Sequence, residues 1–160
     1  IAAAKYPPVG NRSLGGGMAS LNFATTSGEY FKKANDEILV ILQTESPQGV
    51  DNAEAIYALP GVDAIFVGPV DLRANMRRPD GSEASDEEFE RALQRIVDAG
   101  KKTGTPTGMH TMDTKSALQR AEQGMQFIAI GSDLRLMTMQ AQEVLKTVRP
   151  EAGAREVAKY

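Results

Sequence analysis

Two stretches of the sequence, Ile38-Leu-Val-Ile-Leu-Gln-Thr-Glu45 and Val62-Asp-Ala-Ile-Phe-Val-Gly-Pro-Val-Asp-Leu72, decide how this chain folds. Each contains an apolar run followed by a carboxylate, and about a helix's length of chain separates the two runs. Continuous apolar runs are typical of strands in a parallel sheet that is covered on both faces. Because right-handed crossovers place the carboxyl ends of parallel neighbours on the same side, we expect Glu45 and Asp71 to emerge side by side at one rim. Proteins of the α/β class place their chemistry at that rim.

The rest of the chain alternates apolar runs with amphipathic segments. These segments are bounded by helix start and stop signals, such as Ser46-Pro47, the capping box Ser85–Glu88 and Gly124. The pattern predicts strands over 38–44, 62–67, 106–110 and 127–131. It predicts helices over 28–35, 46–59, 85–100, 111–123 and 132–148, a helical end over 1–5 and one helical turn over 71–76. The polar tail from Arg149 is expected to be weakly helical at most.

Four strand–helix units raise a question of completeness. A closed (β/α)8 barrel takes eight units in roughly 250 residues, whereas four parallel strands alone leave two apolar edges unpaired. Either two chains complete each other, or residues 1–160 are the second half of a longer polypeptide. The start at Ile1, inside a helix-like segment, favours the second interpretation.

Composition sets bounds on partners and compartment. With 41% hydrophobic and 24% charged residues, the chain is typical of a globular domain. A net charge of −3 without a basic stripe gives no support for nucleic acid as a partner, and no apolar run approaches the roughly 18 residues of a membrane span. The absence of cysteine excludes disulfides and thiol catalysis and fits a reducing compartment, so we expect a cytoplasmic protein.

Two carboxylates at adjacent strand ends, with no cysteine and one histidine, point to a hard divalent cation such as Mg²⁺ or Mn²⁺. The alternative is that Glu45 and Asp71 only cap the helices that follow them, and spacing alone does not separate the two interpretations. His110, at the end of the third strand, is either a ligand or general base, or a packed or hydrogen-bonded rim residue.

Three further features have a plain and a functional interpretation. The run Gly15-Gly-Gly17 lies in a loop without the preceding strand and lysine of a phosphate-binding loop, so a mobile surface loop is the simpler interpretation. Arg12 either binds an anionic substrate or holds its own loop by a salt bridge. Arg77 and Arg78 are expected to be solvated loop charges.

The residues resemble a known family, the metal-dependent (class II) pyruvate aldolases of the HpcH/HpaI type. The resemblance lies in Gln43-Thr-Glu45, in Asn52 with Ile56, and in the segment 61–72. Tyr6-Pro-Pro-Val-Gly-Asn-Arg12 is similar to the family's loop before its fifth strand, and Gly124 with Phe127–Asp133 to its last strand. The resemblance covers nearly the whole chain. It implies that residues 1–160 form one domain, the C-terminal half of a (β/α)8 TIM barrel.

The resemblance also implies roles. Glu45 and Asp71 match the family's metal-binding carboxylates, and Gln43 matches a side chain that contacts bound pyruvate. The backbone of Gly68, Pro69 and Val70 would hold the pyruvate carboxylate. The implied reaction is cleavage of a hydroxy-keto acid into pyruvate and an aldehyde through a metal-stabilised enolate, with Mg²⁺ or Mn²⁺ as the cofactor and Co²⁺ as a further candidate. The family assembles as trimers or hexamers, so a homo-oligomer is expected, with the last helix or the polar tail against a neighbour.

Two departures from the family are visible. The family's histidine base and an arginine that supports the enolate come from the first half of the barrel, so no catalytic residue is assigned in this chain, and His110 does not correspond to that base. Arg73 stands where a small or polar residue is usual, which implies a different aldehyde pocket. Two alternative functions stay open: an acyl-coenzyme A ester lyase of the related citrate-lyase-like group, and a non-catalytic half-barrel scaffold.

Overall fold

A four-stranded parallel sheet forms the centre of the computed structural model, which describes residues 1–150. The strands are β1 (Ile41–Thr44), β2 (Ala64–Val67), β3 (Thr107–Thr111) and β4 (Phe127–Ile130), and they lie in chain order across the sheet. The helices are α1 (Met18–Leu21), α2 (Ser27–Glu37), α3 (Pro47–Asp51), α4 (Ala53–Tyr57), α5 (Pro69–Asn75), α6 (Asp86–Thr103), α7 (Thr114–Gln123) and α8 (Asp133–Val148). The prediction of a parallel α/β arrangement is confirmed.

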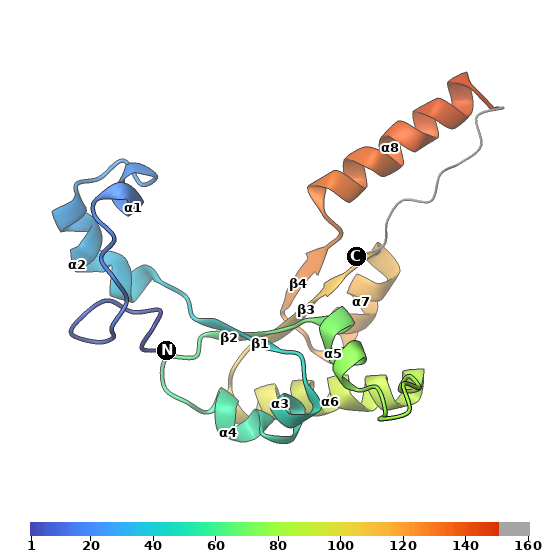
Figure 1. The fold of residues 1–160 in the computed structure, drawn as a ribbon, viewed down its shortest axis with the longest axis horizontal. Coiled ribbons are helices and arrows are strands. Elements are labelled where there is room, and N and C mark those ends of the chain that lie inside the picture. Colours follow the sequence, from blue (N-terminus) through green and yellow to red (C-terminus); the bar gives the residue numbers. More distant parts are fainter. Residues whose placement is uncertain (151–160) are drawn as a thin grey trace.

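One face of the sheet carries the hydrophobic core. Helices α3, α4 and α6 lie along the sheet below β1 and β2, as Figure 1 shows. The alternation of side chains along each strand sends every second residue toward these helices. The largest fully buried side chains are Tyr57, Ile65, Val67, Leu72, Leu93, Ile96 and Val97. Packing between sheet and helices therefore fixes the strand ends at which the site residues lie.

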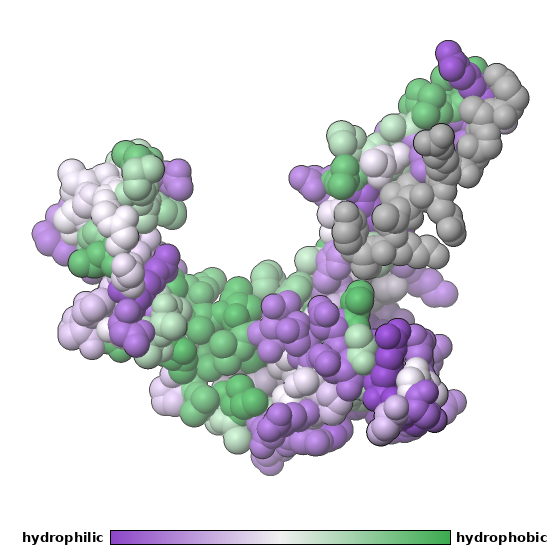
Figure 2. Space-filling view, viewed as in Figure 1, coloured by the Kyte–Doolittle hydropathy of each residue, from purple (hydrophilic) through white to green (hydrophobic). Residues whose placement is uncertain are grey.

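The opposite face of the sheet is open among the described residues. Its side chains include Phe66 and Phe127, whose ring centroids are 5.3 Å apart. Ile41 and Phe127 are each at least 40% exposed. Figure 2 shows apolar residues gathered in the hollow between the α1–α2 part and α8. Parallel sheets bury both faces in complete folds, so this is the face that would line a barrel.

Several predicted boundaries are wrong, for local reasons. Residues 1–5 form turns instead of a helix, because the carbonyls of Ala2 and Lys5 accept from the backbone of the following loop, at Asn11 and Arg12. The helix predicted over 46–59 breaks in two at Asn52, whose side chain donates to the main-chain oxygen of Gln48 at 2.8 Å.

The first strand is shorter than predicted, and the short helix after β2 is longer. The amide of Val40 donates to the Asp63 carboxylate at 2.6 Å, and β1 starts only at Ile41. Helix α5 begins at Pro69 and runs to Asn75, which is seven residues where one turn was expected. Ser46 and the capping box at Ser85 cap their helices as predicted. The predicted tail falls mostly on residues 151–160, outside the described residues.

None of the helices described in residues 1–150 has the length and apolar character needed to cross a membrane.

A buried pair of hydroxyls ties β1 to the helix layer. The hydroxyls of Thr44 and Tyr57 lie 2.8 Å apart, and Thr105 donates to the main-chain oxygen of Tyr57 at 2.8 Å. Burial raises the pKa of Tyr57, and the hydrogen bond to Thr44 acts in the opposite direction. The fold therefore favours the neutral phenol.

Tyr57 is expected to make stability depend on alkaline pH. Below about pH 10 the phenol is neutral in both states, so its contribution is fully present. Above that pH, the phenol ionises in the unfolded chain before it ionises in the folded one, because folding raises its pKa, so the free energy of unfolding falls. Tyr57→Phe should remove part of this alkaline loss and cost about 1–2 kcal/mol at pH 7, because the Thr44 hydroxyl is left unpaired. Urea unfolding from pH 7 to 11 measures both effects. Adding Thr44→Val to Tyr57→Phe should restore much of the stability lost at pH 7. If stability falls as steeply above pH 10 in Tyr57→Phe as in the unsubstituted protein, Tyr57 is not the source of the alkaline loss.

Candidate functional site

The end of β1 sends three consecutive side chains to alternating faces of the sheet. Thr44 is buried and turned to the helix layer through its bond to Tyr57. Because neighbouring residues of a strand point to opposite faces, Gln43 and Glu45 turn toward the open face. Gln43 is exposed and Glu45 is half-buried. The buried Thr44 thus fixes which way the two predicted site residues face.

The end of β2 lies beside this point and continues into α5. Thr44 pairs with Val67, so Gly68 is the first residue past the last paired position. Helix α5 begins directly with Pro69, and Asp71 is in its first turn. Leu72 is fully buried and packs this helix onto the core. Asp71 is therefore held at the rim with an exposed side chain.

Gly68 lies beside the side chains of Gln43 in β1 and of Glu45 just beyond it. A Cβ built on Gly68 would lie 2.7 Å from Oε2 of Glu45 and 3.6 Å from Nε2 of Gln43. The first distance is shorter than real Cβ contacts, so only glycine leaves the carboxylate in its present place. Gln43, Glu45 and Gly68 therefore form one cluster, with Asp71 three residues further along the chain.

Gly68→Ala is expected to displace the Glu45 carboxylate while the protein stays folded, because the obstructed atom is the end of a flexible side chain. We expect affinity for Mn²⁺ to fall roughly tenfold, a loss of the size seen when a group next to a metal ligand is altered. Calorimetric titration with MnCl₂ measures it. Gly28→Ala is the matched control, since a Cβ there meets nothing within 4 Å. Equal affinity in the two variants would contradict this close contact.

The capping alternative for the two carboxylates is wrong. Helix α3 is capped by the Ser46 hydroxyl, which accepts from the amide of Gly49 at 3.1 Å, and α5 has no side-chain cap. Within residues 1–150, neither the Glu45 nor the Asp71 carboxylate hydrogen-bonds to, or forms an ion pair with, another side chain. Their oxygens are available to a ligand.

The donor set fits a hard divalent cation. Carboxylate oxygens are the ligands that Mg²⁺ and Mn²⁺ prefer, and Mg²⁺ is usually held by one or two carboxylates with water or substrate completing its shell. In the described part of the chain no group of three or more His, Cys, Asp or Glu forms a ready-made metal cage. Glu45 and Asp71 can therefore supply two ligands and leave positions for substrate oxygens.

His110 is held to the neighbouring strand end. Its Nε2 lies 2.8 Å from the main-chain oxygen of Gly131, just beyond β4. This contact agrees with the interpretation of His110 as a hydrogen-bonded rim residue. His110 also lines a cleft of about 500 Å³ beside the site, together with Pro69, Val70, Arg73 and Arg120.

Three arginines are engaged within the chain. Arg120, 7% exposed, donates to the Glu90 carboxylate, and this bond holds the pKa of Glu90 below its usual range. Arg73 pairs with Asp86 at 2.8 Å and lies over the Phe89 ring. Arg12 lies over the Tyr6 ring, 4.9 Å from its centroid, and makes no ion pair with the residues described, so of its two interpretations the salt bridge is wrong.

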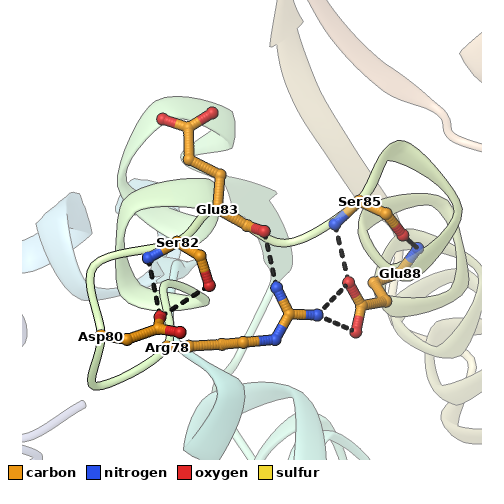
Figure 3. A network of polar contacts seen from close by, with 6 residues as sticks. All are labelled: Arg78, Asp80, Ser82, Glu83, Ser85 and Glu88. Atoms are coloured by element: carbon orange, nitrogen blue, oxygen red, sulfur yellow. Dashed lines mark hydrogen bonds and ion pairs between the residues drawn. The ribbon is translucent and has the colours of Figure 1, made fainter.

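Arg78 is an exposed loop charge, as expected, but it is not free. Figure 3 shows its guanidinium between Glu83, in the loop that joins α5 to α6, and Glu88, in the first turn of α6. It donates to both oxygens of Glu88 at 2.9 Å and to the main-chain oxygen of Glu83 at 2.7 Å. The amide of Ser85 and the Arg78 guanidinium lower the pKa of Glu88. This network orders the loop after α5, whereas Arg77 makes only an exposed pair with Glu83.

The family model described as HpcH/HpaI aldolase/citrate lyase matches residues 2–139. The chain belongs to this family. The resemblance in the sequence is thereby confirmed, and the chain corresponds to a C-terminal segment of the HpcH/HpaI fold.

Curated HpcH/HpaI relatives carry aldolase names. The hydroxypyruvate/pyruvate aldolase of Chromohalobacter salexigens is 37% identical over 145 residues, which cover 91% of this chain and 56% of that protein. The 5-keto-4-deoxy-D-glucarate aldolase of Klebsiella pneumoniae is 40% identical over 134 residues, which cover 84% of this chain and 51% of that protein. The chain therefore spans about half the length of the curated relatives it matches.

Solved structures of the HpcH/HpaI family agree with the fold. A family protein from Burkholderia cenocepacia superposes with a TM-score of 0.77 at 33% identity, over 91% of this chain and 57% of that one. The HpcH/HpaI aldolase from Desulfitobacterium hafniense superposes with a TM-score of 0.73 at 26% identity, over 98% of this chain and 60% of that one. The prediction of a TIM-barrel type fold, of which this chain supplies part, is confirmed.

Proposed function

We propose that the complete protein is a metal-dependent aldolase, a carbon–carbon lyase that cleaves a hydroxy-keto acid into pyruvate and an aldehyde. The observation that carries the proposal is the cluster at the ends of β1 and β2. There the Glu45 carboxylate adjoins Gly68, Asp71 follows in the first turn of α5, and neither carboxylate has a protein partner among the described residues. The aldolase names of relatives with 36–40% identity support the same chemistry.

Each residue of the cluster has a role in this proposal. Glu45 and Asp71 hold the cation, which is Mg²⁺ or Mn²⁺ with Co²⁺ as a further candidate. When bound, the cation supplies the positive charge that favours the enolate of pyruvate. Gln43 donates its amide to pyruvate, and the backbone of Gly68, Pro69 and Val70 at the start of α5 receives the pyruvate carboxylate, where the helix dipole favours an anion. The proton-transferring base and an arginine are expected from outside this segment, so the proposal assigns His110 no proton transfer.

The test is the exchange of pyruvate methyl protons for deuterium, followed by NMR on the full-length protein. We expect exchange that depends on Mn²⁺ or Mg²⁺ and stops with a chelator. Release of pyruvate from a 4-hydroxy-2-oxo acid should require the same metal. A requirement for a coenzyme A thioester instead would select the acyl-CoA lyase alternative. Absence of both metal and pyruvate binding in calorimetry would select the scaffold.

Small molecules, pyruvate and an aldehyde, are the proposed partners. The trimeric or hexameric homo-oligomer and the cytoplasmic location stay predictions.

A further inference from the structure

Helix α5 touches the candidate site at both of its ends. Its first turn carries Asp71, and its last residue is Asn75, four positions later and hence on the same side of the helix. The Nδ2 group of Asn75 donates to the main-chain oxygen of Glu45 at 2.8 Å. One short helix therefore carries one candidate ligand and holds the backbone of the other.

The bond from Asn75 fixes the Glu45 backbone at a point that lies outside both the sheet and the next helix. The pairing of β1 with β2 ends at Thr44 and Val67, so Glu45 lies just beyond the last paired position. Helix α3 begins only at Pro47. Between these elements the Asn75 amide is the side-chain group that fixes the Glu45 carbonyl among the described residues.

Helix α5 is itself firmly placed. Leu72, between the two site-facing positions, is fully buried in the core. Arg73 pairs with Asp86 at the start of α6, and its guanidinium lies 4.2 Å from the centroid of the Phe89 ring. Asn75 therefore donates from a fixed point, and the bond transmits the position of α5 to Glu45.

We propose that Asn75 is a positioning residue that sets the spacing of the Glu45 and Asp71 carboxylates, and through it the choice of cation. This inference rests on the proposed function, because it needs both carboxylates to bind metal. Mg²⁺ demands near-ideal octahedral geometry at short distances, whereas Ca²⁺ accepts longer and less regular shells. Loss of the bond should therefore weaken Mg²⁺ binding more than Ca²⁺ binding.

The experiment compares Asn75→Ala with Asn52→Ala in the full-length protein. Asn52 makes the same kind of bond, from Nδ2 to a main-chain oxygen at 2.8 Å, but within the neighbouring α3–α4 segment. Calorimetric titrations with MgCl₂ and with CaCl₂ give two affinities for each variant. Asn75→Ala is expected to weaken Mg²⁺ binding about three- to tenfold, the loss typical of one hydrogen bond, and Ca²⁺ binding less than about twofold. Asn52→Ala should leave both affinities unchanged.

A thermal melt of each variant separates positioning from general stability. A purely structural role predicts that Asn75→Ala and Asn52→Ala lower both affinities by a common factor that follows the fall in Tm. That result, or an unaltered ratio of Mg²⁺ to Ca²⁺ affinity in Asn75→Ala, overturns the positioning role alone. If the unsubstituted protein binds neither cation, the proposed function itself fails, and the positioning role fails with it.

Discussion

Glu45→Gln is expected to weaken Mn²⁺ binding by more than about 100-fold and to abolish metal-dependent proton exchange of pyruvate. Altering residues that only support a metal ligand costs 10- to 100-fold, so loss of a charged ligand should cost more. Residues 1–150 hold no group of three or more His, Cys, Asp or Glu that would offer an alternative metal site. Calorimetry with MnCl₂ and NMR of pyruvate in D₂O, both on the full-length protein, measure the two effects.

The control is Glu37→Gln. Glu37 is exposed, whereas Glu45 is half-buried, and Glu37 ends α2, away from the rim, with no role in the proposed site. The fold should survive Glu45→Gln, because the Glu45 carboxylate contributes no hydrogen bond or ion pair within the described chain. An affinity in Glu45→Gln within twofold of that in Glu37→Gln would show that Glu45 is not a metal ligand and would remove the basis of the aldolase proposal.

Gly108→Ala is expected to have the largest effect on stability. Gly108 faces Phe127 across β3 and β4, and a Cβ there would lie 1.7 Å from the main-chain oxygen of Phe127. A backbone atom cannot move aside as a flexible side chain can, so the two strands must separate. We expect a loss of about 3 kcal/mol or more in unfolding free energy, and hence a Tm lower by roughly 10 °C.

Gly28→Ala serves as the comparison for this loss too. Its position in α2 is open, and alanine favours a helix over glycine, so the change should be neutral or stabilising by up to about 1 kcal/mol. Differential scanning calorimetry of both variants tests the contrast. Equal melting temperatures would mean that β3 and β4 are not in the close contact described above.

The sequence predicted the strands and most helices, because both follow from periodicity and from local capping. Ser46 and Ser85 cap their helices where their side chains and the spacing to Glu88 indicate. The errors lie where a side chain competes with the backbone. Asn52 bonds to the Gln48 carbonyl and divides a helix, and Asp63 takes the Val40 amide and shortens a strand. Such long-range or irregular contacts leave no periodic signal.

The candidate site, whose roles stay a prediction, could be described from the sequence only by its chain positions. Strand ends on one side of a parallel sheet brought Glu45 and the start of α5 together, as the crossover rule requires. Only atomic positions could show that the two carboxylates have no partners among the described residues and that Ser46 caps α3. Asn75 was missed because an asparagine at a helix end normally indicates a cap, and nothing local shows its bond to a residue 30 positions earlier.

The order of the strands has a consequence for how the chain reaches this structure. Each strand pairs with the one before it in the sequence, so β1, β2, β3 and β4 are neighbours in the order in which they are synthesised. Paired residues of neighbouring strands lie 19 to 42 positions apart in the chain, as for Gly108 with Phe127 and Ile65 with Thr107, and the partner strand always comes first. Each new strand–helix unit therefore finds its partner already made. A growing chain can add units one at a time on the ribosome, so that the end of β1 and the start of α5 can meet before β3 is made.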